Sequence, residues 1–180
     1  MDYTVRYASP LGELVLASDG ESLIGVFFAG QKYDCATVSP DAKRIFSADE
    51  IPVLAQTCAW LDAYFAGKDP GAAPPVVQRG SKFRQRVWSI LEEIPYGRLT
   101  TYGAIAQRIA AETGARASAR AVGGAVGHNH VSIIVPCHRV VGASGSLTGF
   151  GGGLDRKIAL LELEGVDMSR LTRPTRGTAL

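Results

Sequence analysis

The chain has few of the residues that build disulfide frameworks or metal clusters. Its 180 residues include three cysteines, Cys35, Cys58 and Cys137, with no Cys-x-x-Cys pair, and all three histidines lie within residues 128–138. A structural zinc site needs about four suitably spaced Cys or His ligands, and an odd cysteine count argues against a disulfide set. We therefore expect no bound metal and no disulfide framework.

Long apolar runs are also missing. No apolar stretch approaches the roughly 18 to 20 residues that span a bilayer, and the opening MDYTVRYASP lacks a basic segment followed by an apolar one. Hydrophobic residues still make up 46% of the chain, enough for one large core or two small ones. The sequence predicts a globular protein without membrane segments, located in the cytoplasm or, in a nucleated cell, the nucleus.

Charge is unevenly distributed along the chain. Residues 1–80 hold 6 Lys and Arg against 10 Asp and Glu, and residues 81–180 hold 13 against 7. The two parts therefore carry formal charges of −4 and +6. Because basic surfaces attract polyanions, this asymmetry favours contact between the second part and a polyanion, although ordinary scatter of surface charge explains the same counts.

The acidic part predicts a small sheet and a helix. Residues 3–9, 12–18 and 23–29 are strand-forming runs separated by the turn-forming PLG and DGES, which predicts an antiparallel sheet. Residues 47–67 carry an apolar stripe at helical spacing, with Cys58 expected in the core. The Gly- and Pro-rich linker 67–80 then ends a domain that we place at residues 1–80.

The basic part predicts several helices. Residues 81–94 have Ser81 as an N-cap and an apolar stripe that begins at Phe83. Residues 100–112 and 115–127 are two short helices around a Gly-containing turn, the pattern of a helix-turn-helix. A last helix is expected at 154–165, and the tail 166–180 is expected to be loosely ordered.

The second helix of this pair has little with which to read bases. Major-groove recognition uses long polar side chains, whereas residues 117–124 are small except for Arg120. Such a surface suits the DNA minor groove, where Arg120 could fill the gap left by a displaced base. A small-residue helix packed tightly inside the protein explains the same composition, so both interpretations stay open here.

Cys137 lies beside His138 in SIIVPCHRVV, residues 132–141. This run predicts a buried extended segment, and residues 142–153 predict a flexible loop after it. A nucleophilic cysteine needs a base, because its thiol is only a few per cent ionised at neutral pH. Successive side chains of an extended segment point apart, so His138 needs a turn or a bridging water to act on Cys137. On this dipeptide alone, a buried structural cysteine beside an incidental histidine is favoured.

Three motifs together change that balance: IPYGRLTTYGAIA, SARAVGGAVGHN and IVPCHRVVGASGSLTGFGGGLDRKIALLELEG. They closely resemble the O6-alkylguanine-DNA alkyltransferase family, also called methylated-DNA–protein-cysteine methyltransferases, in one register from about Phe83 to Gly165. The resemblance implies an α/β (α+β) protein. An N-terminal ribonuclease-H-like domain with an antiparallel sheet and a helix precedes a mostly helical DNA-binding and catalytic domain, residues 81–165.

The resemblance also implies an activity. The protein is expected to bind double-stranded DNA through the minor groove, flip O6-alkylguanine into a pocket, and transfer the alkyl group irreversibly to Cys137. O4-alkylthymine is an expected lesser substrate. Each molecule would act once, as a monomer without a cofactor, and cooperative assembly on DNA stays open.

Individual roles follow from motif position. In the reaction itself, Cys137 is the implied alkyl acceptor, His138 its water-mediated base and Glu164 the carboxylate behind His138. Asn129 is the implied hinge residue that braces the active-site turn, and Tyr102 is the phenol near the flipped guanine.

The implied DNA contacts centre on Arg120, which takes the place of the flipped base, with Ser118, Ala119, Ala121 and Gly123 around it. The implied base pocket is formed by Tyr102, Val140, Phe150 and Gly151. Family members often have Tyr and Ser where this chain has Phe150 and Gly151, so a side-chain hydrogen bond to the base is expected to be absent here.

Two other activities are compatible with parts of the sequence. A lesion-binding protein without transfer activity would share the DNA-binding features, but relatives of that kind replace the cysteine, commonly with tryptophan, whereas this chain retains Cys137. A cysteine hydrolase could use Cys137, His138 and Glu164 as a triad, but it leaves the small-residue helix without a purpose.

Overall fold

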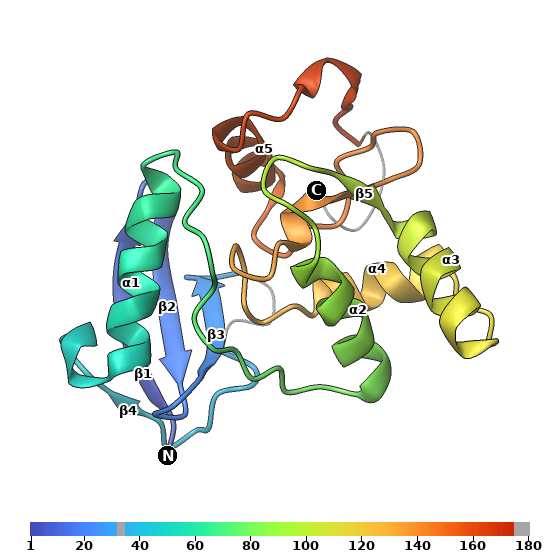
Figure 1. Cartoon of the computed structure of the whole chain (residues 1–180). Helices are drawn as coiled ribbons and strands as arrows, with labels where there is room; N and C mark the ends of the chain where they lie inside the picture. The colour runs from blue at the N-terminus through green and yellow to red at the C-terminus, as the bar shows by residue number, and fades with distance from the viewer. Residues whose placement is uncertain (32–34, 175–180) are drawn as a thin grey trace. The chain divides into compact units, whose positions relative to one another are not determined.

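The computed structural model describes residues 1–31 and 35–174 (Figure 1). The chain forms two compact units. The first contains residues 1–79 and also 130–134, and the second contains residues 80–129 and the chain from 135 onward. The chain therefore returns to its first unit immediately before the segment that carries Cys137.

The first unit is built on a four-stranded sheet in the order β3-β2-β1-β4. The strands β1 (Tyr3–Ser9), β2 (Gly12–Ser18) and β3 (Leu23–Phe28) pair in antiparallel fashion, as the turn signals predicted. The two-residue β4 (Lys43–Arg44) adds a parallel edge that the sequence did not indicate. Every residue of β3 is buried, which makes it the most enclosed strand of this sheet.

The helix α1 (Pro52–Phe65) follows the short 3-10 helix η1 (Ala48–Glu50) and packs against this sheet (Figure 1). Its buried face includes Thr57, Leu61 and Tyr64, which are spaced as one side of a helix. Cys58 lies at the edge of that face and is only half-buried, so its expected place in the core is wrong.

The outer edge of β3 is covered by two distant segments of the same unit. The backbone of Leu23 bonds Pro75 and Val77, and the backbone of Val26 bonds His130 (2.8 Å) and Ser132 (3.0 Å). These bonds satisfy an edge that would otherwise expose unpaired backbone groups. They also fix residues 130–132 a few positions before Cys137.

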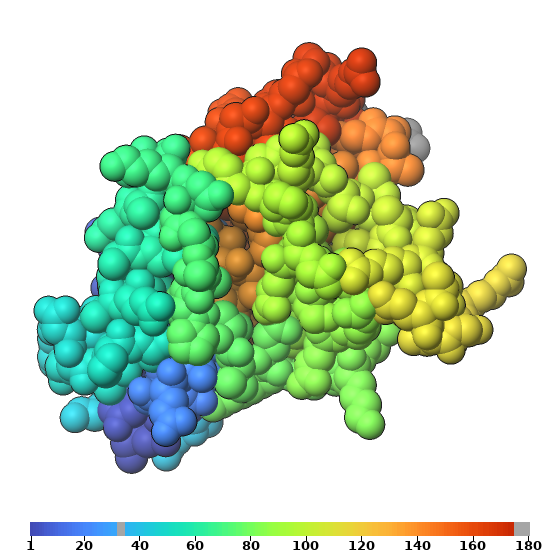
Figure 2. Space-filling view, viewed as in Figure 1, coloured from blue at the N-terminus to red at the C-terminus, as the bar shows by residue number. Residues whose placement is uncertain are grey.

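The second unit is mostly helical. It contains α2 (Lys82–Glu92), α3 (Tyr102–Thr113), α4 (Ala119–Gly127), α5 (Leu154–Leu163) and the 3-10 helices η2 (Cys137–Arg139) and η3 (Met168–Arg170). The strands β5 (Thr100–Thr101) and β6 (Val140–Val141) pair in parallel. Figure 2 shows the surface of α2 and α3 in green to yellow.

Local sequence explains where these helices begin and end. The side chains of Ser81, Thr101 and Ser118 accept backbone hydrogen bonds at the starts of α2, α3 and α4, which satisfies donors that helices leave free. Gly114 ends α3 in the left-handed conformation (φ 69°). The helix-turn-helix predicted from the sequence is therefore formed by α3 and α4.

Three sequence expectations for the chain beyond residue 80 are corrected. Phe83 is 37% exposed instead of buried. Residues 132–141 are buried but form a strand only at Val140–Val141, because Ile133 has φ 72° and Cys137–Arg139 form a 3-10 turn. The tail is ordered over 166–174, where the backbone of Thr172 bonds Gly145 and Leu147; the remainder of the tail lies outside the described residues.

Within the described ranges, no helix is both long and apolar enough to cross a membrane.

Candidate active site

Cys137 lies at the start of the η2 turn and is buried, with 3% of its surface exposed. The Asn129 amide donates to the Val135 carbonyl (2.8 Å), and the Cys137 backbone amide donates to the same carbonyl (2.8 Å). The Asn129 side chain therefore bonds the backbone of the turn, and its implied hinge role stays a prediction. Burial raises the pKa of the Cys137 thiol, while a hydrogen bond from Asn129 and the charge of Lys157 oppose that rise.

The Glu164 carboxylate is the centre of a buried hydrogen-bond network. It lies at the end of α5, and its side chain is fully buried. His138 Nε2 lies 2.6 Å from Oε1, Arg139 Nε and Nη2 donate at 2.8 and 2.9 Å, and the Gly97 amide donates at 3.0 Å. Burial opposes ionisation of Glu164, but the bonds from His138 and Arg139 outweigh it and hold the carboxyl pKa well below its usual range.

The backbone of Gly97 fits closely against the end of α5. Its φ of 70° is in the left-handed region, and an added Cβ would lie 2.8 Å from the Glu164 carbonyl oxygen. Glycine is therefore required in the IPYG turn for its amide to reach the carboxylate. The IPYG motif therefore contributes a backbone donor to the site.

His138 is completely buried. Because a carboxylate only accepts hydrogen bonds, Nε2 carries the proton shared with Glu164, and in the neutral ring the lone pair is on Nδ1. Burial lowers the pKa of the imidazole, against the opposing effect of Glu164. The Phe150 ring contacts the imidazole edge-on, with 6.4 Å between ring centroids.

Lys157 is a buried site residue that the sequence reasoning missed. Its ammonium donates to the Val140 carbonyl (2.6 Å) and the Thr148 carbonyl (2.9 Å). Burial lowers its pKa to about 8, and the Cys137 charge opposes that shift. The sequence pattern could have indicated its burial, because Lys157 lies three residues before the buried Leu160, on the apolar face of the predicted helix.

Tyr102, the first residue of α3, holds the loop after the cysteine. Its hydroxyl donates to the Thr148 carbonyl at 2.8 Å. An added Cβ at Gly149, whose φ is 85°, would overlap that hydroxyl, so this close approach depends on glycine. Burial raises the pKa of Tyr102, so at neutral pH the side chain is a phenol able to donate a proton.

The residues expected to form the base pocket lie in β6 and the following loop. Val140 and Phe150 are buried, whereas Gly151 is partly exposed. Together with Tyr102, Cys137 and His138, they belong to the second unit. All of the predicted catalytic residues therefore belong to one compact unit.

The expected DNA contacts lie on the first turn of α4. Ser118, Ala119, Arg120 and Ala121 are exposed, and Gly123 is partly buried. The buried side of this helix is formed instead by Val122, Ala125 and Val126. The alternative of a helix packed entirely inside the protein is therefore wrong for this turn.

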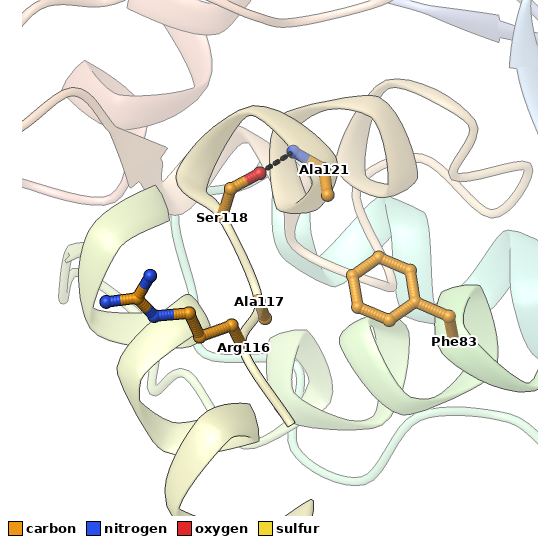
Figure 3. A pocket seen from close by; sticks show the side chains of 5 residues that line it. All are labelled: Phe83, Arg116, Ala117, Ser118 and Ala121. Atoms are coloured by element: carbon orange, nitrogen blue, oxygen red, sulfur yellow. Dashed lines mark hydrogen bonds between the residues drawn. The ribbon is translucent and has the colours of Figure 1, made fainter. Parts of the chain in front are cut away.

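A hollow of about 530 Å³ lies beside this turn. Figure 3 shows Phe83 from α2 across the hollow from Arg116 and Ala117, with Ser118 and Ala121 at the start of α4. The exposed Phe83 and Arg116 were not predicted as part of this surface. In the described part of the chain, no three His, Cys, Asp or Glu residues come together as a metal-binding group.

Comparison with known families agrees with this arrangement. Residues 82–166 match the model of the 6-O-methylguanine DNA methyltransferase, DNA binding domain, and residues 3–71 match that of its ribonuclease-like domain. The fold and these matches thus define an α+β protein of the 6-O-methylguanine DNA methyltransferase class.

Curated relatives include the methylated-DNA–protein-cysteine methyltransferases of Mycobacterium leprae and Haemophilus influenzae. The first is 45% identical over 156 residues, covering 87% of this chain and 88% of the relative; the second is 42% identical over 163 residues, covering 90% and 86%. This chain belongs to the methylated-DNA–protein-cysteine methyltransferase family.

Solved structures of the same family resemble the whole fold. The crystal structure of Mycobacterium tuberculosis O6-methylguanine methyltransferase aligns with a TM-score of 0.76 at 43% identity, covering 98% of this chain and 97% of the other. The Mycobacterium tuberculosis OGT structure in complex with DNA aligns at 0.75 and 42% identity, covering 94% of each chain. The ribonuclease-like and DNA-binding parts predicted from the sequence are confirmed by these matches.

Proposed function

We propose that this protein repairs DNA by direct reversal, moving the alkyl group of O6-alkylguanine irreversibly to Cys137. The observation that carries this proposal is the arrangement of the buried Cys137 on a turn whose next residue, His138, bonds the buried Glu164 carboxylate at 2.6 Å. A structural cysteine has no need of such a partner, whereas a nucleophile needs a base held in one orientation.

The reaction is a displacement at the sp³ carbon of the alkyl group. His138 takes the thiol proton at Nδ1 through a water molecule, and the new bond forms between sulfur and the alkyl carbon. The carbon–O6 bond breaks, and its electron pair stays on the purine. The Lys157 cation is buried near the reacting group and, with the hydrogen bond from Asn129, favours the thiolate over the neutral thiol.

The purine is a poor leaving group unless its charge is neutralised. Tyr102, whose hydroxyl bonds the Thr148 carbonyl in the free protein, turns that donor toward guanine N3. Phe150 offers an apolar face to the base, and backbone groups beside Gly151 bond its remaining edge. The thioether product has no good leaving group, so each molecule reacts once.

We further propose that residues 81–165 bind double-stranded DNA through the minor groove. The exposed small residues Ser118, Ala119 and Ala121 allow close approach of α4, and Arg120 occupies the place of the flipped base. O4-alkylthymine is accepted as a lesser substrate. The protein acts as a monomer, and no cofactor takes part in the transfer.

Mass spectrometry of the intact protein tests the transfer. After incubation with a duplex containing O6-methylguanine, we expect a gain of one methyl group, located on Cys137, and no gain in the Cys137→Ser variant. Tight binding of the lesion without an adduct would instead favour a lesion-binding protein. Release of product in excess of the protein would favour a cysteine hydrolase.

A further inference from the structure

Arg139 is a buried cation whose three hydrogen bonds all stay within the site. Its Nε and Nη2 atoms form two parallel bonds to the Glu164 carboxylate, at 2.8 and 2.9 Å, and Nη1 donates to the Ile94 carbonyl at 2.6 Å. The guanidinium lies 5.7 Å from the centre of the Tyr96 ring. Only 7% of the residue is exposed. A side chain held this firmly does not serve as a mobile DNA contact.

The Glu164 carboxylate is shared between Arg139 and His138. Oε1 is bonded by both His138 Nε2 and Arg139 Nη2, and Oε2 by Arg139 Nε and the Gly97 amide. A buried carboxylate paired with His138 alone would draw a second proton onto the imidazole, because the resulting ion pair removes an uncompensated buried charge. The bidentate guanidinium already supplies the compensating positive charge.

The charged and titratable groups around the imidazole act in both directions. Glu164 favours the imidazolium form of His138, while the charges of Arg139 and Lys157 disfavour it. Cys137 precedes His138 in the same turn, and Tyr102 from α3 interacts with Cys137. Both of these side chains are neutral in the resting protein, since burial raises the pKa of each. The two buried cations therefore outnumber the one buried carboxylate.

We propose that Arg139 is a positioning residue for the transfer: by neutralising the Glu164 carboxylate it keeps the His138 imidazole uncharged, and only the uncharged ring can accept the thiol proton of Cys137. This proposal rests on the proposed role of His138 as the base. Glu164 fixes the tautomer and the orientation of the ring. Burial already lowers the imidazole pKa, and Arg139 prevents the carboxylate from reversing that effect.

Nuclear magnetic resonance of the full chain labelled with ¹⁵N-histidine tests the proposal directly. In the unmodified protein we expect His138 to be neutral at pH 7, with the proton on Nε2. In Arg139→Met, which removes the charge but keeps a long apolar side chain, we expect the His138 titration to move upward by about one pH unit or more. In Arg139→Lys, which keeps a positive charge, we expect the ring to remain neutral at pH 7.

The pH profile of single-turnover methyl transfer supplies a second measurement. In Arg139→Met the acidic limb should move to higher pH by the same amount as the His138 titration, which makes transfer about tenfold slower on that limb. Arg139→Lys should recover most of the wild-type profile. A matched control is Arg173→Met, which removes an exposed arginine whose carboxylate partner is Asp155 on α5, and it should leave both the titration and the profile unchanged.

Two results would overturn the proposal: an imidazolium at His138 in the unmodified protein at pH 7, or an unchanged His138 titration in a folded Arg139→Met variant. If Arg139→Met fails to fold, Arg139→Gln, which removes the charge but keeps a polar side chain, supplies the same comparison, and an unchanged His138 titration in it would equally refute the proposal. Full transfer activity in His138→Gln would refute the base role in the proposed function, while the influence of Arg139 on the imidazole titration would remain measurable separately.

Discussion

Glu164 carries a negative charge in a fully buried side chain, and the site is built around it. Its compensation comes from Arg139, with His138 and the Gly97 amide completing the set of donors. Removing one member of a buried ion pair leaves the other charge uncompensated, which is costlier than loss of an exposed pair. The arrangement is therefore sensitive to single substitutions.

Glu164→Gln should destabilise the protein by about 3–5 kcal/mol, because it leaves the Arg139 charge buried without its partner. Urea denaturation at pH 7 measures this change. The carboxyl pKa is lowered in the folded state, so the unfolded chain takes up a proton first as the pH falls below the ordinary value of 4.5. The wild-type protein should thus lose stability below about pH 4.5, and the variant should show a flatter curve there.

Lys157 has the opposite dependence on pH. Its pKa falls from 10.5 to about 8 in the folded protein, so between these values the unfolded chain holds more protons than the folded one. Stability should therefore rise with pH across this window, by up to about 3 kcal/mol for this group. Lys157→Met should remove that rise. An equally steep rise in Lys157→Met would show that another group is responsible.

At the scale of elements, the helix-turn-helix has an exposed side and a packed side on two faces of α4. Val122 and Ala125 face inward, and the indole of Trp88 on α2 donates to the Ala125 carbonyl at 2.9 Å. Arg120 is exposed at the start of the same helix. Substitution of Arg120 should therefore weaken the repair of duplex DNA without disturbing the packing that holds the cysteine turn.

Arg120→Ala should repair duplex DNA more weakly while reacting almost normally with free O6-benzylguanine, because only base flipping requires the side chain. Single-turnover rates on the two substrates measure the difference. Equal losses on both substrates would mean that Arg120 acts on the chemistry of the site instead.

At the scale of the whole molecule, the formal charge of +6 on residues 81–180 coincides with the part that matches the DNA-binding family model. Affinity for duplex DNA should fall steeply as salt rises, because each neutralised phosphate releases counterions. Fluorescence anisotropy of a labelled duplex checks this expectation. Between 50 and 200 mM salt, we expect the affinity to fall by roughly tenfold or more. The rate with free O6-benzylguanine should change little over the same range.

Much of the fold followed from local sequence. Turn residues between apolar runs predicted β1, β2 and β3, and the cap residue Ser81 and the turn at Gly114 marked the ends of helices. These signals depend on residues within one turn of each other. The prediction failed at Ile133 and the η2 turn, since β-branched residues favour an extended chain and only longer-range contacts impose a left-handed residue and a 3-10 turn there.

The sequence by itself determined the family, the candidate nucleophile Cys137 and its neighbour His138, because those depend on motifs that can be read along the chain. Only the tertiary structure decided that Glu164 bonds His138, that Arg139 shares the same carboxylate and that Lys157 is buried beside the site. Glu164 lies 26 residues from His138 in the chain. The physical reason is that the charge state of a buried group depends on what surrounds it in space, and residues distant in sequence supply those surroundings.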